Sequence, residues 1–158
     1  MGNVKTNAMR ILDSKKVQYD VITYDNKDGK IDGVSVAEKI ERDPKIVFKT
    51  LVTQGNTREL YVFVIPVAEE LDLKKSAKAC GEKKVEMMHV KDINKFTGYI
   101  RGGCSPIGMK KQYKTFIHST AKDLEKIVVS AGKIGFQIEI KPNDLISVLD
   151  GNLSDLIK

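Results

Sequence analysis

The stretch KIVFKTLVTQGNTRELYVFVIPV, residues 45–67, carries the strongest strand signal in the chain. Two runs rich in Val, Ile, Phe and Tyr, at residues 46–54 and 58–65, flank a turn that contains Gly55 and Asn56. β-Rich runs on both sides of such a turn are typical of a β-hairpin. The sequence therefore predicts an antiparallel pair of strands here.

The remaining elements follow from apolar spacing and from turn residues. Helices are predicted at residues 3–16, 68–80 and 90–97 and from Asn143 onward. Further strands are predicted at residues 17–24, 85–87, 113–118, 126–130 and 136–140. Ser35-x-x-Glu38 predicts a capping box that begins another short helix. Six or seven strands with peripheral helices indicate an α+β fold around a mixed sheet, in a single domain of residues 1–158.

The composition limits the function classes. The net charge is +6, from 27 basic and 21 acidic residues, and no apolar run approaches the ~20 residues of a membrane helix. Two cysteines outside any CxxC pair and only two histidines argue against a disulfide framework and a histidine-rich zinc site. We therefore expect a reduced, cytoplasmic protein with no metal, no organic cofactor, and no membrane or DNA partner.

Many of the lysines lie in two clusters. One cluster comprises Lys74, Lys75, Lys78, Lys83 and Lys84, and the other comprises Lys110, Lys111 and Lys114. A solvated helix face is the simpler interpretation of the first cluster. The alternative is contact with the phosphates of an RNA. The candidates for phosphate contact are Lys74, Lys78, Lys110 and Lys111.

Lys49 has an apolar setting within the first run of the hairpin. In a strand, Val47 and Leu51 share its face, while Ile46 and Phe48 belong to the other face. The ammonium group either reaches water at a sheet edge or lines a pocket for an anionic or strongly polar ligand. In a pocket it could orient a carbonyl or a phosphate, or act as a base if burial lowered its pKa from about 10.4.

The stretch TGYIRGGCSPIGMKKQYKTFI, residues 97–117, combines four glycines with the second lysine cluster. Gly102 and Gly103 permit positive φ angles and a close approach to the main chain. They form either a tight connection or a backbone whose N–H groups donate to a carbonyl oxygen or phosphate. Ser130 either faces the same pocket or caps a turn, and packing is the simpler interpretation of Tyr24.

Five segments between Val47 and Gly135 carry a resemblance that covers the chain in order from about Tyr19 to Leu149. They are VFKTLV around Lys49, LDLKKSAKACGEKKVEM, TGYIRGGCSPIG, KTFIHSTA and VVSAGKIG. Together they resemble the YbaK/EbsC family of aminoacyl-tRNA deacylases, which is related to the editing domain of bacterial prolyl-tRNA synthetases. The resemblance implies a curved, mixed, mainly antiparallel and partly barrel-like sheet with peripheral helices. It also implies a pocket for the 3′-aminoacyl-adenosine of tRNA.

The resemblance assigns roles to residues of that pocket. It implies a catalytic Lys49 and a substrate-binding group made of Tyr24, Gly102, Gly103 and Ser130. An aromatic residue that the family has in the loop after Tyr24 has no counterpart here, where GKIDGVS offers Ile31 or Asp32. This departure affects the pocket wall and therefore the amino-acid preference.

The chemistry that the resemblance implies needs no nucleophile from the protein. In cysteine-editing members the substrate's own thiol attacks its ester carbonyl and releases the tRNA and a cyclic thioester. Well-oriented intramolecular attack reaches effective molarities of about 10⁵–10⁸ M, so positioning carries most of the work. The resemblance thus implies a trans-editing deacylase of Cys-tRNA(Pro) and Cys-tRNA(Cys), in which Cys80 and Cys104 are not catalytic. The implied partners are the 3′ acceptor end of an aminoacyl-tRNA and prolyl-tRNA synthetase.

Two other functions fit the same residues. A deacylase for Ala-tRNA(Pro) or another small aminoacyl-tRNA would use water, because alanine has no side-chain nucleophile. A non-catalytic tRNA- or nucleotide-binding module of a synthetase complex is compatible with the lysine clusters.

Overall fold

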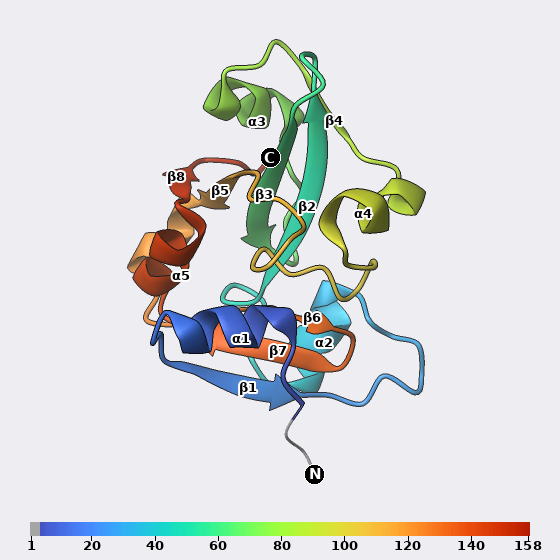
Figure 1. Cartoon of the computed structure of the whole chain (residues 1–158), viewed down its shortest axis with the longest axis vertical. Helices are drawn as coiled ribbons and strands as arrows, with labels where there is room; N and C mark the ends of the chain where they lie inside the picture. Colours follow the sequence, from blue (N-terminus) through green and yellow to red (C-terminus); the bar gives the residue numbers. More distant parts are fainter. Residues whose placement is uncertain (1–3) are drawn as a thin grey trace.

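The hairpin of β2 and β3 runs through the middle of the molecule (Figure 1). In the computed structural model, which describes residues 4–158, β2 spans Phe48–Gly55 and β3 spans Leu60–Pro66. The two strands pair antiparallel from Phe48↔Pro66 to Gln54↔Leu60. The predicted hairpin is therefore confirmed.

The strands form two sheets. The larger sheet has the order β4-β2-β3-β5-β8 and adds β4 (Val85–Met87), β5 (Lys114–His118) and β8 (Asn152–Ser154). Its pairs are antiparallel around β2 and parallel from β3 to β8. The smaller, antiparallel sheet consists of β1 (Tyr19–Thr23), β7 (Phe136–Ile140) and β6 (Ile127–Lys133). The expected α+β class with mixed pairing is confirmed, with the strands divided between two sheets.

The two sheets are joined immediately before β2. Val47 forms an isolated parallel bridge with Val128 of β6, and the Val128 N–H donates to the Ile46 carbonyl at 2.8 Å. The Val67 N–H donates to the Val47 carbonyl at 2.9 Å. This junction sets the smaller sheet beneath the base of the hairpin, as Figure 1 shows.

Within residues 4–158, five α-helices lie around the sheets. They are α1 (Asn7–Ser14), α2 (Gly33–Lys39), α3 (Leu73–Cys80), α4 (Val90–Thr97) and α5 (Pro142–Leu149), and a 3₁₀ turn spans Ser119–Asp123. The predicted start of the first helix at residue 3 lies outside the described residues, and α1 begins at Asn7. Within residues 4–158, none of the helices has the length and apolar character needed to cross a membrane.

Two predicted helix starts are wrong. The capping residue of α2 is Asp32, whose carboxylate accepts the Ser35 N–H at 3.1 Å, so the helix begins before the predicted capping box. The helix predicted from residue 68 begins at Leu73, because the Asp72 side chain accepts the Lys75 N–H at 2.9 Å. In both cases an aspartate satisfies a free N–H group of the first turn.

The C-terminal strand β8 was not predicted. It pairs in parallel with β5 through Ile117↔Leu153, and Leu71 forms a bridge with Ile157. The Leu156 N–H donates to Nδ1 of the buried His118 at 3.2 Å. All of these contacts join residues that are far apart in the chain, so no local pattern indicates the strand.

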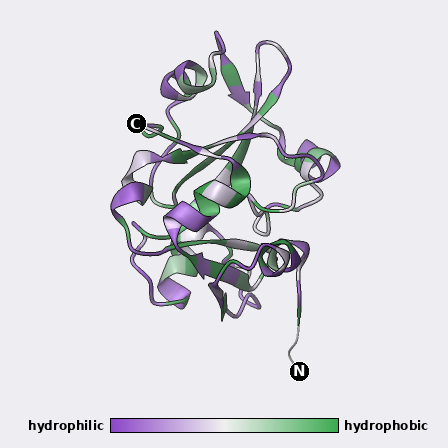
Figure 2. Ribbon diagram, turned by 60° about the vertical axis from the view of Figure 1, so that its left-hand side comes forward, coloured by the Kyte–Doolittle hydropathy of each residue, from purple (hydrophilic) through white to green (hydrophobic). Residues whose placement is uncertain are grey.

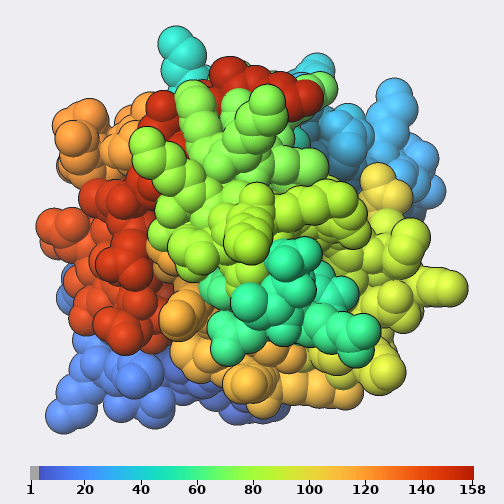
Figure 3. Space-filling model, turned by 90° about the horizontal axis from the view of Figure 1, so that it is seen from above, coloured from blue at the N-terminus to red at the C-terminus, as the bar shows by residue number. Residues whose placement is uncertain are grey.

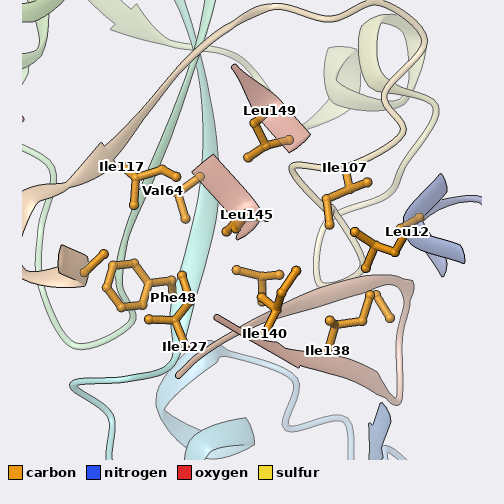
Figure 4. Close-up of a cluster of buried hydrophobic side chains, with 14 of the residues drawn as sticks. Leu12, Phe48, Val64, Ile107, Ile117, Ile127, Ile138, Ile140, Leu145 and Leu149 are labelled. Atoms are coloured by element: carbon orange, nitrogen blue, oxygen red, sulfur yellow. The ribbon is translucent and has the colours of Figure 1, made fainter. Parts of the chain in front are cut away.

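The main hydrophobic core lies between the hairpin and the smaller sheet. Figure 4 shows Phe48 of the hairpin above Ile127, with Ile140 beside them and Ile138 below Ile107 and Leu12, all within one cluster that includes Val64. Hydrophobic residues concentrate in the strands that cross the molecule, whereas the outer turns are largely hydrophilic (Figure 2). Burial of these side chains, at about 25 cal/mol per Å² of apolar surface, is the main force that fixes the base of the hairpin.

Tyr99 holds the glycine-rich loop after α4 against the smaller sheet. Its hydroxyl donates to the Ile107 carbonyl at 2.6 Å, and burial raises its pKa to about 12. Its ring lies so close to Gly132 (φ +95°) that a Cβ added there would be 2.8 Å from a ring carbon. The Tyr99 side chain therefore holds the loop in place through residues that precede and follow Gly102 and Gly103.

Replacing Tyr99 by Phe should lower the free energy of unfolding by about 1–2 kcal/mol, because the buried Ile107 carbonyl loses its donor. Urea unfolding measures this change. The matched control is Tyr113→Phe, since the half-buried Tyr113 hydroxyl donates to the Phe96 carbonyl where water can replace it. Equal losses in the two variants would contradict the anchoring role of Tyr99.

Candidate functional site

A cavity of about 560 Å³ lies between α2, the start of β2 and the loop that follows α4. Its lining includes the predicted residues Lys49, Gly102 and Ser130. Cavities of 300–1,000 Å³ are typical of small-ligand sites. The structure therefore brings residues from three distant parts of the sequence to one place.

Lys49 is the second residue of β2, opposite Ile65 of β3. Burial lowers the pKa of its ammonium group from the ordinary 10.5, while the charges of Glu70 and Glu69 act in the opposite direction. None of the ion pairs within 4 Å among residues 4–158 includes Lys49. The site thus contains a partly desolvated cation without a paired carboxylate, which favours a polar or anionic ligand.

The two adjacent glycines have different positions. Gly102 lines the cavity with a φ of +86°, and a Cβ there would be 2.6 Å from Cδ1 of Ile31. Gly103 is buried outside the lining, and a Cβ there would be 3.2 Å from the Ile134 backbone nitrogen. The Gly103 N–H donates to the Ile100 carbonyl at 3.0 Å. Gly102 therefore presents backbone to the cavity, and Gly103 packs the loop against the turn between β6 and β7.

Ser130 and Gln137 face each other across β6 and β7 and both line the cavity. The Ser130 hydroxyl accepts the Gly132 N–H at 3.2 Å, where β6 is interrupted by a bulge. Gln137 is only 6% exposed. Sequence reasoning missed Gln137, although a lone amide in the strand FQIEI was a usable signal for a polar wall.

Tyr24 does not line this cavity. It packs against the hydrophobic cluster beneath α2, and Nζ of Lys39 lies 5.8 Å from its ring centroid. Ile31 and Asp32, which the sequence offers in place of an aromatic residue, both line the cavity. Hydrogen bonds from Ser35 lower the pKa of Asp32, so this carboxylate is engaged in capping α2.

The predicted lysines lie outside the cavity, on two sides of the hairpin. Lys74 and Lys78 are exposed on α3, and Lys110 and Lys111 are exposed after the glycine-rich loop. Helices α3 and α4 lie on opposite sides of the hairpin in Figure 1, and Nζ of Lys110 donates to the Lys95 carbonyl of α4 at 3.2 Å. The cation at the cavity wall besides Lys49 is Arg101, which sequence reasoning did not select.

Burial disfavours the thiolate form of both cysteines. Cys104 lines the cavity, but burial raises its pKa to about 11. Burial also raises the pKa of Cys80, which lies on α3 away from the cavity. Among residues 4–158, no group of three His, Cys, Asp or Glu side chains is arranged to hold a metal ion. The cavity can therefore position a ligand and stabilise negative charge with Lys49 and backbone N–H groups.

Solved structures of other proteins share this fold. A structure described as "hypothetical protein APE2540" matches with a TM-score of 0.88 at 16% identity, over 97% of this chain and 100% of that chain. A "putative trans-editing enzyme for prolyl tRNA synthetase" matches with a TM-score of 0.84 at 17% identity, over 99% of both chains. At these identities the likeness shows the fold.

The family follows from the sequence itself. The aminoacyl-tRNA editing domain matches residues 32–148, and the chain belongs to this family. It is 49% identical over 152 residues to the "Putative Cys-tRNA(Pro)/Cys-tRNA(Cys) deacylase EbsC" of Enterococcus faecalis, which covers 96% of this chain and 93% of that protein.

Replacing Lys49 by Met should leave the protein at least as stable at pH 7, because the folded state then no longer desolvates a charge. At pH values between the lowered pKa of Lys49 in the folded protein and its ordinary pKa of 10.5, the unfolded wild type binds more protons than the folded wild type. Wild-type stability should therefore rise with pH relative to the variant over this range.

Urea unfolding at pH 7 and at steps up to pH 10.5 tests this expectation. Lys74→Met, on the exposed face of α3, is the matched control for the loss of a lysine side chain. A Lys49→Met variant that is clearly less stable than wild type at pH 7 would contradict the desolvation argument.

Proposed function

We propose that the protein is a trans-editing deacylase that releases cysteine from Cys-tRNA(Pro) and Cys-tRNA(Cys). The observation that carries the proposal is the joint placement of Lys49 and Gly102 in one cavity of about 560 Å³. The name of the 49% identical relative, which covers 96% of the chain, supports this substrate.

In the proposed reaction, Lys49 stabilises the negative charge that develops on the ester carbonyl oxygen. The Gly102 N–H acts as the second donor to that oxygen. Preorganised donors in a water-poor site are effective because they need no reorganisation when charge appears. The Ser130 hydroxyl and the Gln137 amide, on the wall formed by β6 and β7, are the acceptors for the substrate's α-ammonium group.

The nucleophile in this proposal is the thiol of the substrate. Its sulfur attacks the ester carbonyl carbon, the bond from that carbon to the ribose oxygen breaks, and the ribose oxygen receives the thiol proton. The products are tRNA with a free terminal hydroxyl and a cyclic thioester, which water then opens to cysteine. The high pKa of Cys104, about 11, is consistent with a protein that supplies no thiolate of its own.

We also propose that tRNA selectivity comes from prolyl-tRNA synthetase as a partner. A cavity of about 560 Å³ suits an aminoacyl-adenosine but not the tRNA elements that distinguish one acceptor from another.

Lys49→Ala should lower kcat/KM for Cys-tRNA(Pro) by about 10²–10³-fold, the usual effect of removing one oxyanion donor. The assay is release of labelled amino acid from Cys-, Ser- and Ala-charged tRNA(Pro), with wild-type protein and with Lys141→Ala, at an exposed position, as the matched control. Inertness of the wild type towards all three substrates, combined with RNA binding, would instead indicate a non-catalytic module. Full activity of Lys49→Ala would remove its proposed role.

Methylation of the substrate sulfur tests the nucleophile. The protein should release cysteine from tRNA(Pro) and leave S-methylcysteinyl-tRNA(Pro) essentially intact. A thioether sulfur has no proton to lose, so it cannot form the cyclic thioester unless its methyl group leaves. Rapid release of S-methylcysteine and of alanine would indicate attack by water and a deacylase for small amino acids.

A further inference from the structure

A second hollow, which we call the basic groove, lies on the α4 side of the hairpin. It has a volume of about 610 Å³ and is lined by three cations, Arg58, Lys111 and Lys114, and by two aromatic residues, Phe96 and Tyr113. Figure 3 shows the three segments of its wall side by side: the turn after β2 in teal, α4 in yellow-green and residues near 112 in orange. The groove shares no lining residue with the cavity around Lys49.

Further cations lie on α4 and on the loop after it, a segment that contributes Phe96 to the basic groove and Arg101 to the cavity. Arg101 lines the cavity just after α4, and Lys95 lies on α4 itself. Nζ of Lys110 donates to the Lys95 carbonyl at 3.2 Å, and the Lys110 N–H donates to the Thr97 carbonyl at 3.0 Å. Because α4 has eight residues, it is about 12 Å long, a distance that a few nucleotides span.

The cations of the basic groove, of α4 and of the loop after it form no ion pairs within the described residues. None of the ion pairs within 4 Å among residues 4–158 includes the cations Arg58, Lys95, Arg101, Lys110, Lys111 or Lys114. The groove has one carboxylate, that of Glu59, which accepts the Tyr61 hydroxyl at 3.4 Å. A row of cations that repel one another along a concave surface favours a ligand with regularly spaced negative charges.

Aromatic rings hold two of these lysines. Nζ of Lys95 lies 5.2 Å from the Phe96 ring centroid, and Nζ of Lys111 lies 6.0 Å from the Tyr113 centroid. The Tyr113 hydroxyl donates to the backbone carbonyl of Phe96 at 2.8 Å, which holds Tyr113 against the last turn of α4. Cation–π contacts of this kind limit the freedom of the lysine side chains before a ligand arrives.

Arg58 occupies a backbone conformation that side chains rarely adopt. Its φ is +75°, in the turn where its N–H donates to the Gly55 carbonyl at 2.9 Å. A glycine would suit this conformation better. Arg58→Gly therefore removes a cation from the groove without an expected loss of fold stability.

We propose that the basic groove binds the phosphodiester backbone of the acceptor arm of the same tRNA whose aminoacyl end enters the cavity. This inference rests on the proposed function for the identity of the RNA. The groove supplies sequence-independent affinity, and the cavity supplies recognition of the aminoacyl ester.

The test compares two triple variants that each lower the net charge by five, two for every Lys→Glu and one for the change to Gly. The groove variant is Arg58→Gly, Lys111→Glu and Lys114→Glu. The control variant, away from both lysine clusters, is Lys16→Gly, Lys122→Glu and Lys141→Glu, all at exposed positions. Lys16 has a φ of +58°, so its change to Gly matches that of Arg58. Each protein is assayed with Cys-tRNA(Pro), with cysteinyl-adenosine that lacks the acceptor arm, and for binding of uncharged tRNA at several salt concentrations.

The groove variant should lower kcat/KM for Cys-tRNA(Pro) about tenfold or more and leave that for cysteinyl-adenosine within about twofold of wild type. The slope of log Kd for uncharged tRNA against log salt should fall by about three, one for each lost phosphate contact. The control variant should match wild type in all three measurements. Arg58→Gly alone should retain the wild-type thermal midpoint and lower the salt slope by about one.

Several results would overturn the inference. These are unchanged tRNA binding by the groove variant, equal losses on both substrates, or an equal effect of the control variant. Unchanged tRNA binding with a lost response to added synthetase would assign the groove to a protein partner instead. Failure of the wild type to cleave either substrate would remove the proposed function, while the binding measurement would still test the groove.

Discussion

The unpaired charge of Lys49 is the feature on which the candidate site depends. Its ammonium group is partly desolvated at the second residue of β2, and burial lowers its pKa. The parallel bridge Val47↔Val128 joins the two sheets two residues earlier. Because this junction and the packed core below it fix the strand, the backbone holds the cation in place without an ion pair. A charge held in this way is available to a ligand.

The glycine-rich loop supplies a complementary surface because it is rigidly held. Gly102 has a φ of +86° and lies close to the Ile31 side chain. The Tyr99 ring packs against Gly132 of the smaller sheet, and its hydroxyl donates to the Ile107 carbonyl within the loop. Beyond the loop, the cations around α4 remain without carboxylate partners among residues 4–158, whereas Lys75 on the α3 side pairs with Asp155 at 3.0 Å. The cations around α4 are therefore available to an anionic ligand.

Sequence patterns predicted the presence and type of the helices and strands better than their end residues or their contacts in the tertiary structure. The hairpin around Lys49 follows from alternation and turn residues, which are local properties. The start of α2 was misplaced because Asp32, rather than Ser35, satisfies the first N–H groups. Gln137 was overlooked, and Tyr24 was placed at the pocket, because the register between β6 and β7 and the packing beneath α2 decide which side chains reach the cavity.

The sequence by itself determined the α+β class, the hairpin, the exposed lysines and the unusual setting of Lys49, since hydrophobic periodicity, turn chemistry and charge are encoded by neighbouring residues. The ordered motifs also indicated the family. Only the tertiary structure decided that Lys49, Gly102 and Ser130 line one cavity, that Gly103 lies outside it, and that Asn152–Ser154 form β8 beside β5. These features depend on contacts between residues that are distant in the chain, whose partners are selected by burial of the whole core and not by any single segment.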